Sequence, residues 1–223
     1  MEINFYWRGF FEMPDLCREC IYSWREHGHT PVLWSHDNVK LSGIESRDAA
    51  KIFTPIPNEL PAIVADGFRY KLLADYGGVW ADCDILCLKK LPDFSGTSFA
   101  SELAVDGSNA PTNCFIYAEP DCPVMQALWE AYQRVPRPMT WGDTGPTLVN
   151  EIMKSHEANI YEFKFMCPVA WWEYKNLGIN DFSLDLSHSF GLHFWHELWK
   201  RNGGFETAGH RSPIWTLINK RTH

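Results

Sequence analysis

The stretch from Asp66 to Leu86 constrains the fold of this chain more than any other part of the sequence. Its apolar residues up to Tyr76 recur at helical spacing, which predicts an amphipathic helix packed against another element. Gly77 and Gly78 end this helix, because glycine readily adopts the left-handed conformation that a helix C-terminus commonly needs. A short apolar run then predicts a strand over residues 79–81.

Two carboxylates, Asp82 and Asp84, follow this strand with Cys83 between them. If the chain stays extended, residues two apart lie on one side, so the two carboxylates point together. Like charges at that distance raise each other's pKa unless a cation or hydrogen-bond donors satisfy them. Oxygen ligands at the end of a buried strand suit Mg²⁺ or Mn²⁺. The alternative is a polar turn after an edge strand.

The spacing within this stretch resembles the sugar-nucleotide site of DXD glycosyltransferases of family 32 type. That group includes yeast initiating mannosyltransferases, capsular-polysaccharide transferases and, more distantly, the glucosylating clostridial toxins. The resemblance rests on an Asp followed by an Arg three residues later, a helix, two glycines, a hydrophobic–aromatic pair and Asp-x-Asp. In this chain these positions are Asp66, Arg69, Gly77, Gly78, Val79, Trp80, Asp82 and Asp84. Two departures are Trp80, where Tyr is usual, and Cys83 inside the acidic pair.

Strands and helices alternate early in the chain and strands come closer together later, which predicts an α/β sandwich with a central mixed sheet flanked by helices. The resemblance implies the GT-A nucleotide-diphospho-sugar transferase fold in a single domain over residues 1–223. It further implies a nucleotide-sugar-binding half over residues 1–90 and an acceptor-side half over residues 91–223.

The further predicted elements are helices and strands bounded by Pro, Gly and polar residues. They are a first strand at 3–7, helices at 14–27, 61–76, 123–134 and 147–155, a helical turn at 48–53, strands at 32–34, 85–88, 99–103 and 114–118, and a flexible tail over the site at 201–223.

The reaction that the resemblance implies is metal-dependent transfer of a sugar from a UDP- or GDP-sugar to a hydroxyl of a glycan or other acceptor, with retention of configuration. Asp84 is expected to bind Mn²⁺ or Mg²⁺ directly, and Asp82 to reach the ribose or a metal-bound water. His193 is expected to complete the protein ligands, with His188 and His196 as weaker alternatives.

Several residues are expected on the donor side of the site. Trp7, or Tyr6 in another register, matches the family's base-stacking aromatic at the end of the first strand; the alternative is a core aromatic. Ser35 ends the second predicted strand, where ligands gather in an open α/β sheet. Asp66 and Arg69 are expected to bind donor-sugar hydroxyls, with Arg69 also near the diphosphate; the alternative is a local salt bridge.

Three more candidates lie later in the chain. The family places an Asn near the donor site, and Asn113 matches it; a plain turn residue is the alternative. Asp143 precedes a Thr-Gly-Pro segment that resembles the family's acceptor side, so it is a candidate for capping the next helix, binding the acceptor or acting as general base if the product is inverted. Trp195 is expected to help close the pocket.

Composition restricts partners and location. A net charge of −8 argues against nucleic acid, because phosphate binding needs clustered Lys and Arg. The chain begins without a signal-peptide pattern and has no apolar run near the ~20 residues of a membrane span, so we expect a cytoplasmic protein with no membrane span. Seven cysteines without a pairing pattern predict free thiols, and the lone Cys17–Cys20 pair has no partner pair for zinc.

Two other functions use the same residues. A metal-dependent phosphohydrolase of the haloacid dehalogenase type also begins with Asp-x-Asp, but that family has Thr or Val four residues after the first Asp, where this chain has Leu86. An inactive sugar-binding module is the third interpretation, and the intact Asp82–Asp84 pair argues against it.

Overall fold

A computed structural model describes residues 1–8, 12–57, 59–136, 138–140 and 142–219. The strands are β1 (Glu2–Tyr6), β2 (Thr30–Ser35), β3 (Glu45–Asp48), β4 (Gly78–Ala81), β5 (Ile85–Cys87), β6 (Ser98–Leu103), β7 (Asn109–Ala118), β8 (Asn159–Ile160) and β9 (Gly191–His193). The α-helices are α1 (Asp15–Glu26), α2 (Pro61–Tyr76), α3 (Pro123–Arg134), α4 (Pro146–Ile152), α5 (His196–Arg201) and α6 (Pro213–Asn219). Short 3₁₀ helices are η1 (Ala49–Lys51), η2 (Phe163–Phe165), η3 (Trp171–Gly178) and η4 (Phe205–Thr207).

Within the described residues, a seven-stranded mixed sheet has the order β3-β2-β1-β4-β7-β6-β8. β3, β2, β1 and β4 run parallel, whereas β7 is antiparallel to both β4 and β6. A separate two-stranded ribbon pairs β5 with β9. The predicted central mixed sheet is therefore confirmed.

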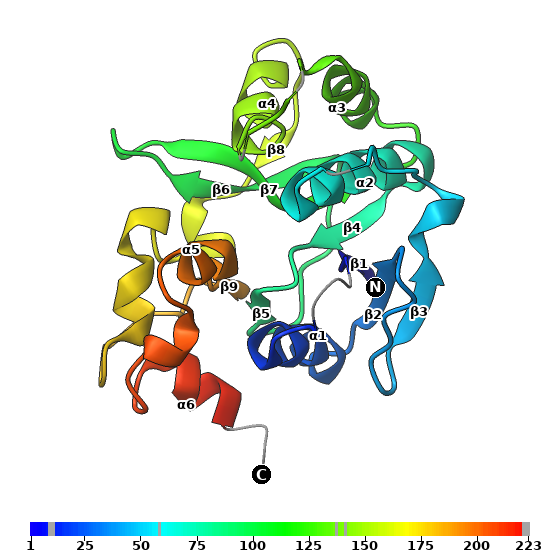
Figure 1. Cartoon of the computed structure of the whole chain (residues 1–223). Coiled ribbons are helices and arrows are strands. Elements are labelled where there is room, and N and C mark those ends of the chain that lie inside the picture. Colours follow the sequence, from blue (N-terminus) through cyan, green and yellow to red (C-terminus); the bar gives the residue numbers. More distant parts are fainter. Residues whose placement is uncertain (9–11, 58, 137, 141, 220–223) are drawn as a thin grey trace.

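Helices cover both faces of the sheet. α2, α3 and α4 lie on one face, while α1 and the β5–β9 ribbon lie on the other (Figure 1). Each face has its own apolar cluster: Phe68 and Tyr132 belong to the first, and Ile21 and Trp24 to the second. Along β1, β2 and β4, successive apolar side chains point to opposite faces of the sheet, so each strand contributes residues to both clusters. The site described below lies at the carboxyl ends of the central strands β1 and β4, between these two layers.

α2 has the bounds that the sequence predicts, but it is not amphipathic. Buried residues lie all around it, because the sheet covers one side and α3 covers the other. Gly67 marks the close approach of α3: a Cβ there would lie 2.4 Å from the ring of Tyr132. The helix ends at Gly77, whose φ of 66° is accessible to glycine at little cost.

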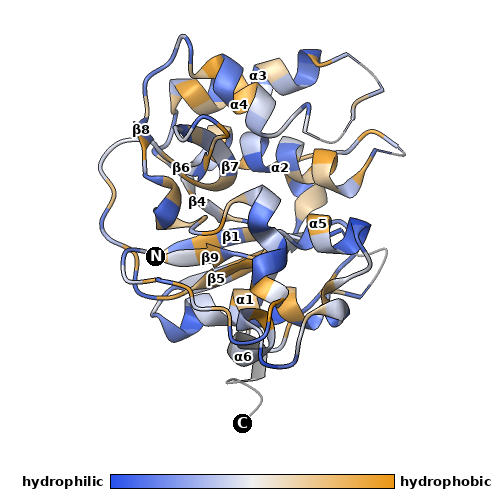
Figure 2. Cartoon of the chain, turned by 90° about the vertical axis from the view of Figure 1, so that its left-hand side faces the viewer, coloured by the Kyte–Doolittle hydropathy of each residue, from blue (hydrophilic) through white to orange (hydrophobic). Residues whose placement is uncertain are grey.

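The C-terminal part forms a third packed layer and not the predicted flexible tail. Ile214 of α6 is fully buried, in one cluster with Leu16 and Cys20 of α1 and with residues of η3 and η4. α1 and α6 lie together beneath the β5–β9 ribbon in Figure 2. The tail prediction is therefore wrong for residues 201–216, because their apolar side chains pack on the outer side of α1; residues 220–223 lie outside the described part. No helix among the described residues is long and apolar enough to cross a membrane.

Candidate active site

The acidic pair lies where the direction of the sheet connections changes. β1 is connected to β2 through α1 on one face, and β3 is connected to β4 through α2 on the other face. The parallel neighbours β1 and β4 are therefore the point where the strand order reverses. Ligands of open α/β sheets bind at the carboxyl ends of the strands at such a point. Asp82 follows β4 directly, and Trp7 follows β1.

The Asp82–Asp84 segment is a turn and not the extended chain that the sequence argument assumed. The N–H of Ile85 donates to the carbonyl of Asp82 at 3.1 Å, which closes a four-residue turn. The two carboxylates nevertheless approach each other. Alternation in a strand is therefore the wrong reason for their proximity, and the turn between β4 and β5 is the right one.

Asp82 is held from behind by two donors. Its Oδ1 lies 3.0 Å from a guanidinium nitrogen of Arg69 and accepts from Nε1 of Trp80 at 3.0 Å. Burial raises the pKa of Asp82 to about 7, although the attraction of Arg69 opposes the rise. About a quarter of its side chain (27%) remains exposed, more than that of Asp84 (12%) or Arg69 (4%). Asp82 is thus the carboxylate that solvent and ligands reach first.

Asp84 pairs with His193. Oδ1 of Asp84 lies 3.3 Å from Nε2 of His193, and Oδ2 accepts from the backbone N–H of His196 at 2.7 Å, at the start of α5. Burial opposes charge on both groups, but their mutual attraction outweighs it. The attraction raises the pKa of His193 well above its usual value and, with the hydrogen bonds, holds the pKa of Asp84 below its usual range.

Pairing of β5 with β9 brings the late histidine to the acidic pair. Ile85 lies opposite His193 in this ribbon, so the residue just after Asp84 fixes the position of the imidazole. One ligand atom each from Asp82, Asp84 and His193 lies within 4.8 Å of the others. Two carboxylate oxygens and one imidazole nitrogen fit a hard divalent ion such as Mn²⁺ or Mg²⁺.

Asp66 and Arg69 form the buried layer beneath the acidic pair. They lie 3.2 Å apart, and Arg69 also donates to the carbonyl of Asn113. Asp66 accepts from Nδ2 of Asn113 at 2.7 Å and from the hydroxyl of Thr144 at 2.7 Å. Burial raises the pKa of Asp66, and Arg69 and these hydrogen bonds oppose the rise. The predicted i, i+3 pair is therefore part of a larger network, to which Thr144 of the Thr-Gly-Pro segment belongs.

The predicted aromatic and polar residues on the donor side lie in different environments. Tyr6 is buried: its hydroxyl bonds Nδ1 of His36 at 2.8 Å and its ring stacks on Phe68. Trp7 is half-buried at the end of β1, with its ring centroid 6.4 Å from that of His196. Ser35 is buried and accepts from its own turn. Of these residues, Trp7 is the one that is not buried.

Two later candidates also have defined positions. Asp143 is half-buried, and its Oδ2 accepts from the backbone N–H and hydroxyl of Thr140, so it stabilises its own turn; the N-cap of α4 is Gly145. The predicted cap role for Asp143 is therefore wrong. Trp195 lies against His193 with ring centroids 4.0 Å apart, and its Nε1 donates to the carbonyl of Val169.

Two cysteines for which the sequence predicts no site lie on the other side of His193. Cys114 of β7 and Cys167 are buried next to the imidazole. Their separation of 53 residues leaves no local pattern, so only the fold reveals them. All seven cysteines are free, as predicted, and Cys17 and Cys20 face different apolar clusters.

Comparisons with known proteins agree with this geometry. A comparison with curated proteins finds no match. Among solved structures, the chain is similar to the PaToxG glycosyltransferase, with 16% identity, 68% of each chain covered and a TM-score of 0.55. It is also similar to the UDP-bound glycosyltransferase domain of the YGT toxin, with 11% identity, 72% of this chain and 78% of that chain covered, and a TM-score of 0.52.

At these identities the structural matches establish the fold, which is the predicted GT-A class of glycosyltransferase domains. A family model described as a glycosyltransferase sugar-binding region containing a DXD motif matches residues 14–101. This range includes Asp66, Arg69 and the Asp82–Asp84 pair. Residues 14–101 of this chain are therefore similar to a glycosyltransferase sugar-binding region, and Asp82-Cys83-Asp84 is the Asp-x-Asp sequence within the matched range.

Proposed function

We propose that the protein transfers a sugar from a UDP- or GDP-sugar to a hydroxyl of a glycan or other acceptor, and that the reaction needs a divalent ion. The convergence of Asp82, Asp84 and His193 at the carboxyl end of β4 carries this proposal. The metal, the donor class and the acceptor are all parts of the proposal.

Asp84, Asp82 and His193 are the residues proposed to hold Mn²⁺ or Mg²⁺. The ion, when bound, supplies positive charge that stabilises the diphosphate leaving group. The chain supports this arrangement through Arg69, whose guanidinium holds Asp82 in place from the buried side. Trp80 adds to it, because its Nε1 bonds Asp82 and its ring lies 4.7 Å from the Arg69 guanidinium carbon.

Residues 1–90 and residues 91–223 are in contact at Asp66. We propose that residues 1–90 bind the nucleotide-sugar and residues 91–223 the acceptor. Asn113 and Thr144 of the later half bond Asp66 of the earlier half, so the two halves share one buried network. Asn113 and Thr144 fill two of the roughly four acceptor positions of the Asp66 carboxylate, and Arg69 lies at a third. We propose that the remaining position accepts from a donor-sugar hydroxyl.

The nucleotide is proposed to lie over the ends of β1 and β2. Trp7 is the residue proposed to stack on the base, because the hydroxyl and ring of Tyr6 are already engaged. Because Ser35 is buried, we propose that it supports the nucleotide site from below and does not contact the nucleotide. Trp195 is proposed to shape the pocket beside His193.

Retention of configuration remains part of the proposal. Asp143 is the general base only if the product is inverted, and both of its bonds go to Thr140. Anomeric analysis of the product decides between the two outcomes. An inverted product whose formation depends on Asp143 would refute retention.

The test is an incubation with Mn²⁺ and a panel of UDP- and GDP-sugars. Slow, Mn²⁺-dependent release of nucleoside diphosphate supports the transferase. Release of phosphate from phosphomonoesters supports the phosphohydrolase instead, and thermal stabilisation by free sugar without turnover supports a binding module. Asp84→Asn should remove the activity, while Asp106→Asn in the exposed β6–β7 turn is the matched control.

A further inference from the structure

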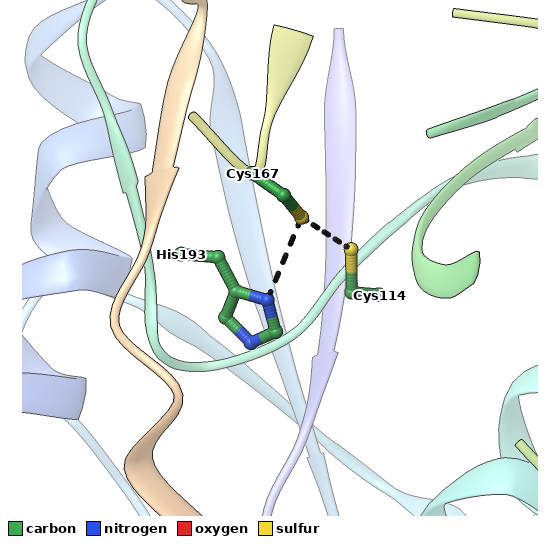
Figure 3. A group of neighbouring side chains, drawn as sticks. All are labelled: Cys114, Cys167 and His193. Carbon is green, nitrogen blue, oxygen red and sulfur yellow. Dashed lines mark hydrogen bonds between the residues drawn. The ribbon is translucent and has the colours of Figure 1, made fainter. Parts of the chain in front are cut away.

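A second cluster of ligand-type side chains lies on the opposite side of the His193 ring from the DXD motif. Cys114, Cys167 and His193 come from β7, from the segment after η2 and from β9, and Figure 3 shows them converging. All three are buried, with exposed fractions of 2%, 0% and 6%. Sγ of Cys114 lies 3.6 Å from Sγ of Cys167, which lies 3.7 Å from Nδ1 of His193.

These separations are those that a tetrahedral zinc ion requires. Zinc lies about 2.3 Å from thiolate sulfur and about 2.0–2.1 Å from imidazole nitrogen. Tetrahedral angles then place two sulfur ligands about 3.8 Å apart and a sulfur and a nitrogen ligand about 3.6 Å apart. The three ligand atoms already lie within 4.8 Å of one another, so no large movement is needed to bind an ion.

The second nitrogen of His193 supports the same interpretation. A histidine that binds zinc through one ring nitrogen usually donates its other N–H to a carboxylate, which fixes the tautomer and the ring orientation. Nε2 of His193 lies 3.3 Å from Oδ1 of Asp84, while Nδ1 faces the sulfurs. The backbone of His193 is fixed as well, because its N–H donates to the carbonyl of Met166 and it pairs with Ile85.

We propose that Cys114, Cys167 and His193 form a binding site for a thiophilic divalent ion of the zinc class, with the fourth position taken by water. Binding requires both sulfurs as thiolates and Nδ1 of His193 without a proton; the protons displaced from these atoms go to solvent, so no redox partner is involved. The chemistry of sulfur ligands separates this site from the oxygen-rich DXD pair, which suits a hard ion.

The two sites share His193, and this gives a consequence that rests on the proposed function. A neutral imidazole has one nitrogen lone pair free for a metal. When Nδ1 binds the thiophilic ion, Nε2 carries the proton and donates to Asp84. His193 can then no longer bind an ion held by Asp82 and Asp84. Zinc should therefore weaken Mn²⁺ binding at these two residues without competing for their carboxylates.

The test uses the full chain, freed of metal with a chelator and kept reduced with a phosphine. Cd²⁺ is added first, because cadmium–thiolate bonds absorb in the near ultraviolet. Competition with a chromophoric chelator then gives the zinc affinity. We expect one ion per chain with the absorption of two thiolates. Absence of the band in the reduced wild-type chain would overturn the proposal.

Variants assign the ligands. Cys114→Ser and Cys167→Ser should each weaken zinc binding by more than about 100-fold. The loss of a direct ligand should exceed the roughly 10–100-fold loss that follows from changing a residue that only bonds a ligand. Cys122→Ser is the matched control, since Cys122 is also buried but lies in the apolar cluster of Phe68 and Tyr132, next to Thr97. Unchanged zinc binding in Cys114→Ser would contradict the assignment.

A measurement on the wild-type chain covers the case in which a variant does not fold. Zinc should protect Cys114 and Cys167, but not Cys122, from alkylation during mild unfolding, as read by mass spectrometry. Equal labelling of all three with and without zinc would refute the site. None of these readouts involves a nucleotide, so failure of the transferase proposal and failure of the zinc site are distinguishable.

Discussion

Replacement of Arg69 by Met should destabilise the protein strongly. The Arg69 side chain is 4% exposed, and its guanidinium lies 3.2 Å from Asp66 and 3.0 Å from Asp82. Removing one partner of a buried ion pair costs about 3–5 kcal/mol, because the other charge stays buried and unpaired. Asp66 keeps Asn113 and Thr144 as donors, so most of the loss falls on Asp82, which keeps only Trp80.

The loss should depend on pH in a defined direction. The folded-state pKa of Asp82 is about 7, above its unfolded value, so this carboxyl binds a proton more readily in the folded state and its burial lowers stability as pH rises. Without Arg69 the pKa of Asp82 rises further. The difference between wild type and Arg69→Met should therefore be small at pH 6, where Asp82 is largely protonated, and larger at pH 8.5.

Urea unfolding at these two pH values measures the effect. A loss of 3–5 kcal/mol corresponds to a fall in Tm of about 6–20 °C for a chain of this size. The double variant Arg69→Met, Asp82→Asn removes both charges and should recover at least half of the loss at pH 8.5. At pH 8.5, a loss below about 1 kcal/mol, or a double variant no more stable than Arg69→Met, would refute the reasoning.

Two further predictions concern stability. The buried His29 accepts from the N–H of Leu91, and burial lowers its pKa to about 4, so the unfolded chain binds a proton more readily than the folded one. As pH drops from 6.5 to 4, stability should therefore fall by about 1–2 kcal/mol, allowing for solvent screening. The unfolding free energy of His29→Gln should lack this dependence on pH. Gly77→Ala should cost about 1–3 kcal/mol more than Gly107→Ala by thermal unfolding, because both glycines have positive φ but only a Cβ at Gly77 would meet backbone, 2.7 Å from N of Pro120; equal losses would contradict this account.

The elements with strong local signals could be predicted from the sequence. α2 and α3 have the predicted bounds because each starts at a proline and carries apolar residues at helical spacing. β3 was missed, since the four residues of Glu45–Asp48 are polar and show no apolar alternation; the strand forms because β2 offers an edge to pair with. β7 begins at Asn109, before the predicted strand at 114–118, because residues 109–111 pair with β6.

The residues of the candidate site also divide into those with a local sequence signal and those that meet only in the fold. Asp66, Arg69, Asp82 and Asp84 have a fixed spacing within one helix–strand unit, so the sequence predicts them together. The proximity of His193 to Asp84 depends on the β5–β9 pairing, and the resemblance alone indicated it. Cys114 and Cys167 meet only through tertiary packing, which no spacing encodes.

The most direct test of the central claim is the binding of UDP and GDP by titration calorimetry, with Mn²⁺ and then with a chelator. Asp84→Asn is better than Asp84→Ala for this purpose, because the amide oxygen can still accept from the N–H of His196 and the fold around His193 is kept. The account predicts that one of the two nucleotides binds the wild type only with Mn²⁺ and binds Asp84→Asn at least about tenfold more weakly, a difference of about 1.4 kcal/mol, while Asp106→Asn binds normally. Nucleotide binding that is unaffected by the chelator or by Asp84→Asn would contradict it.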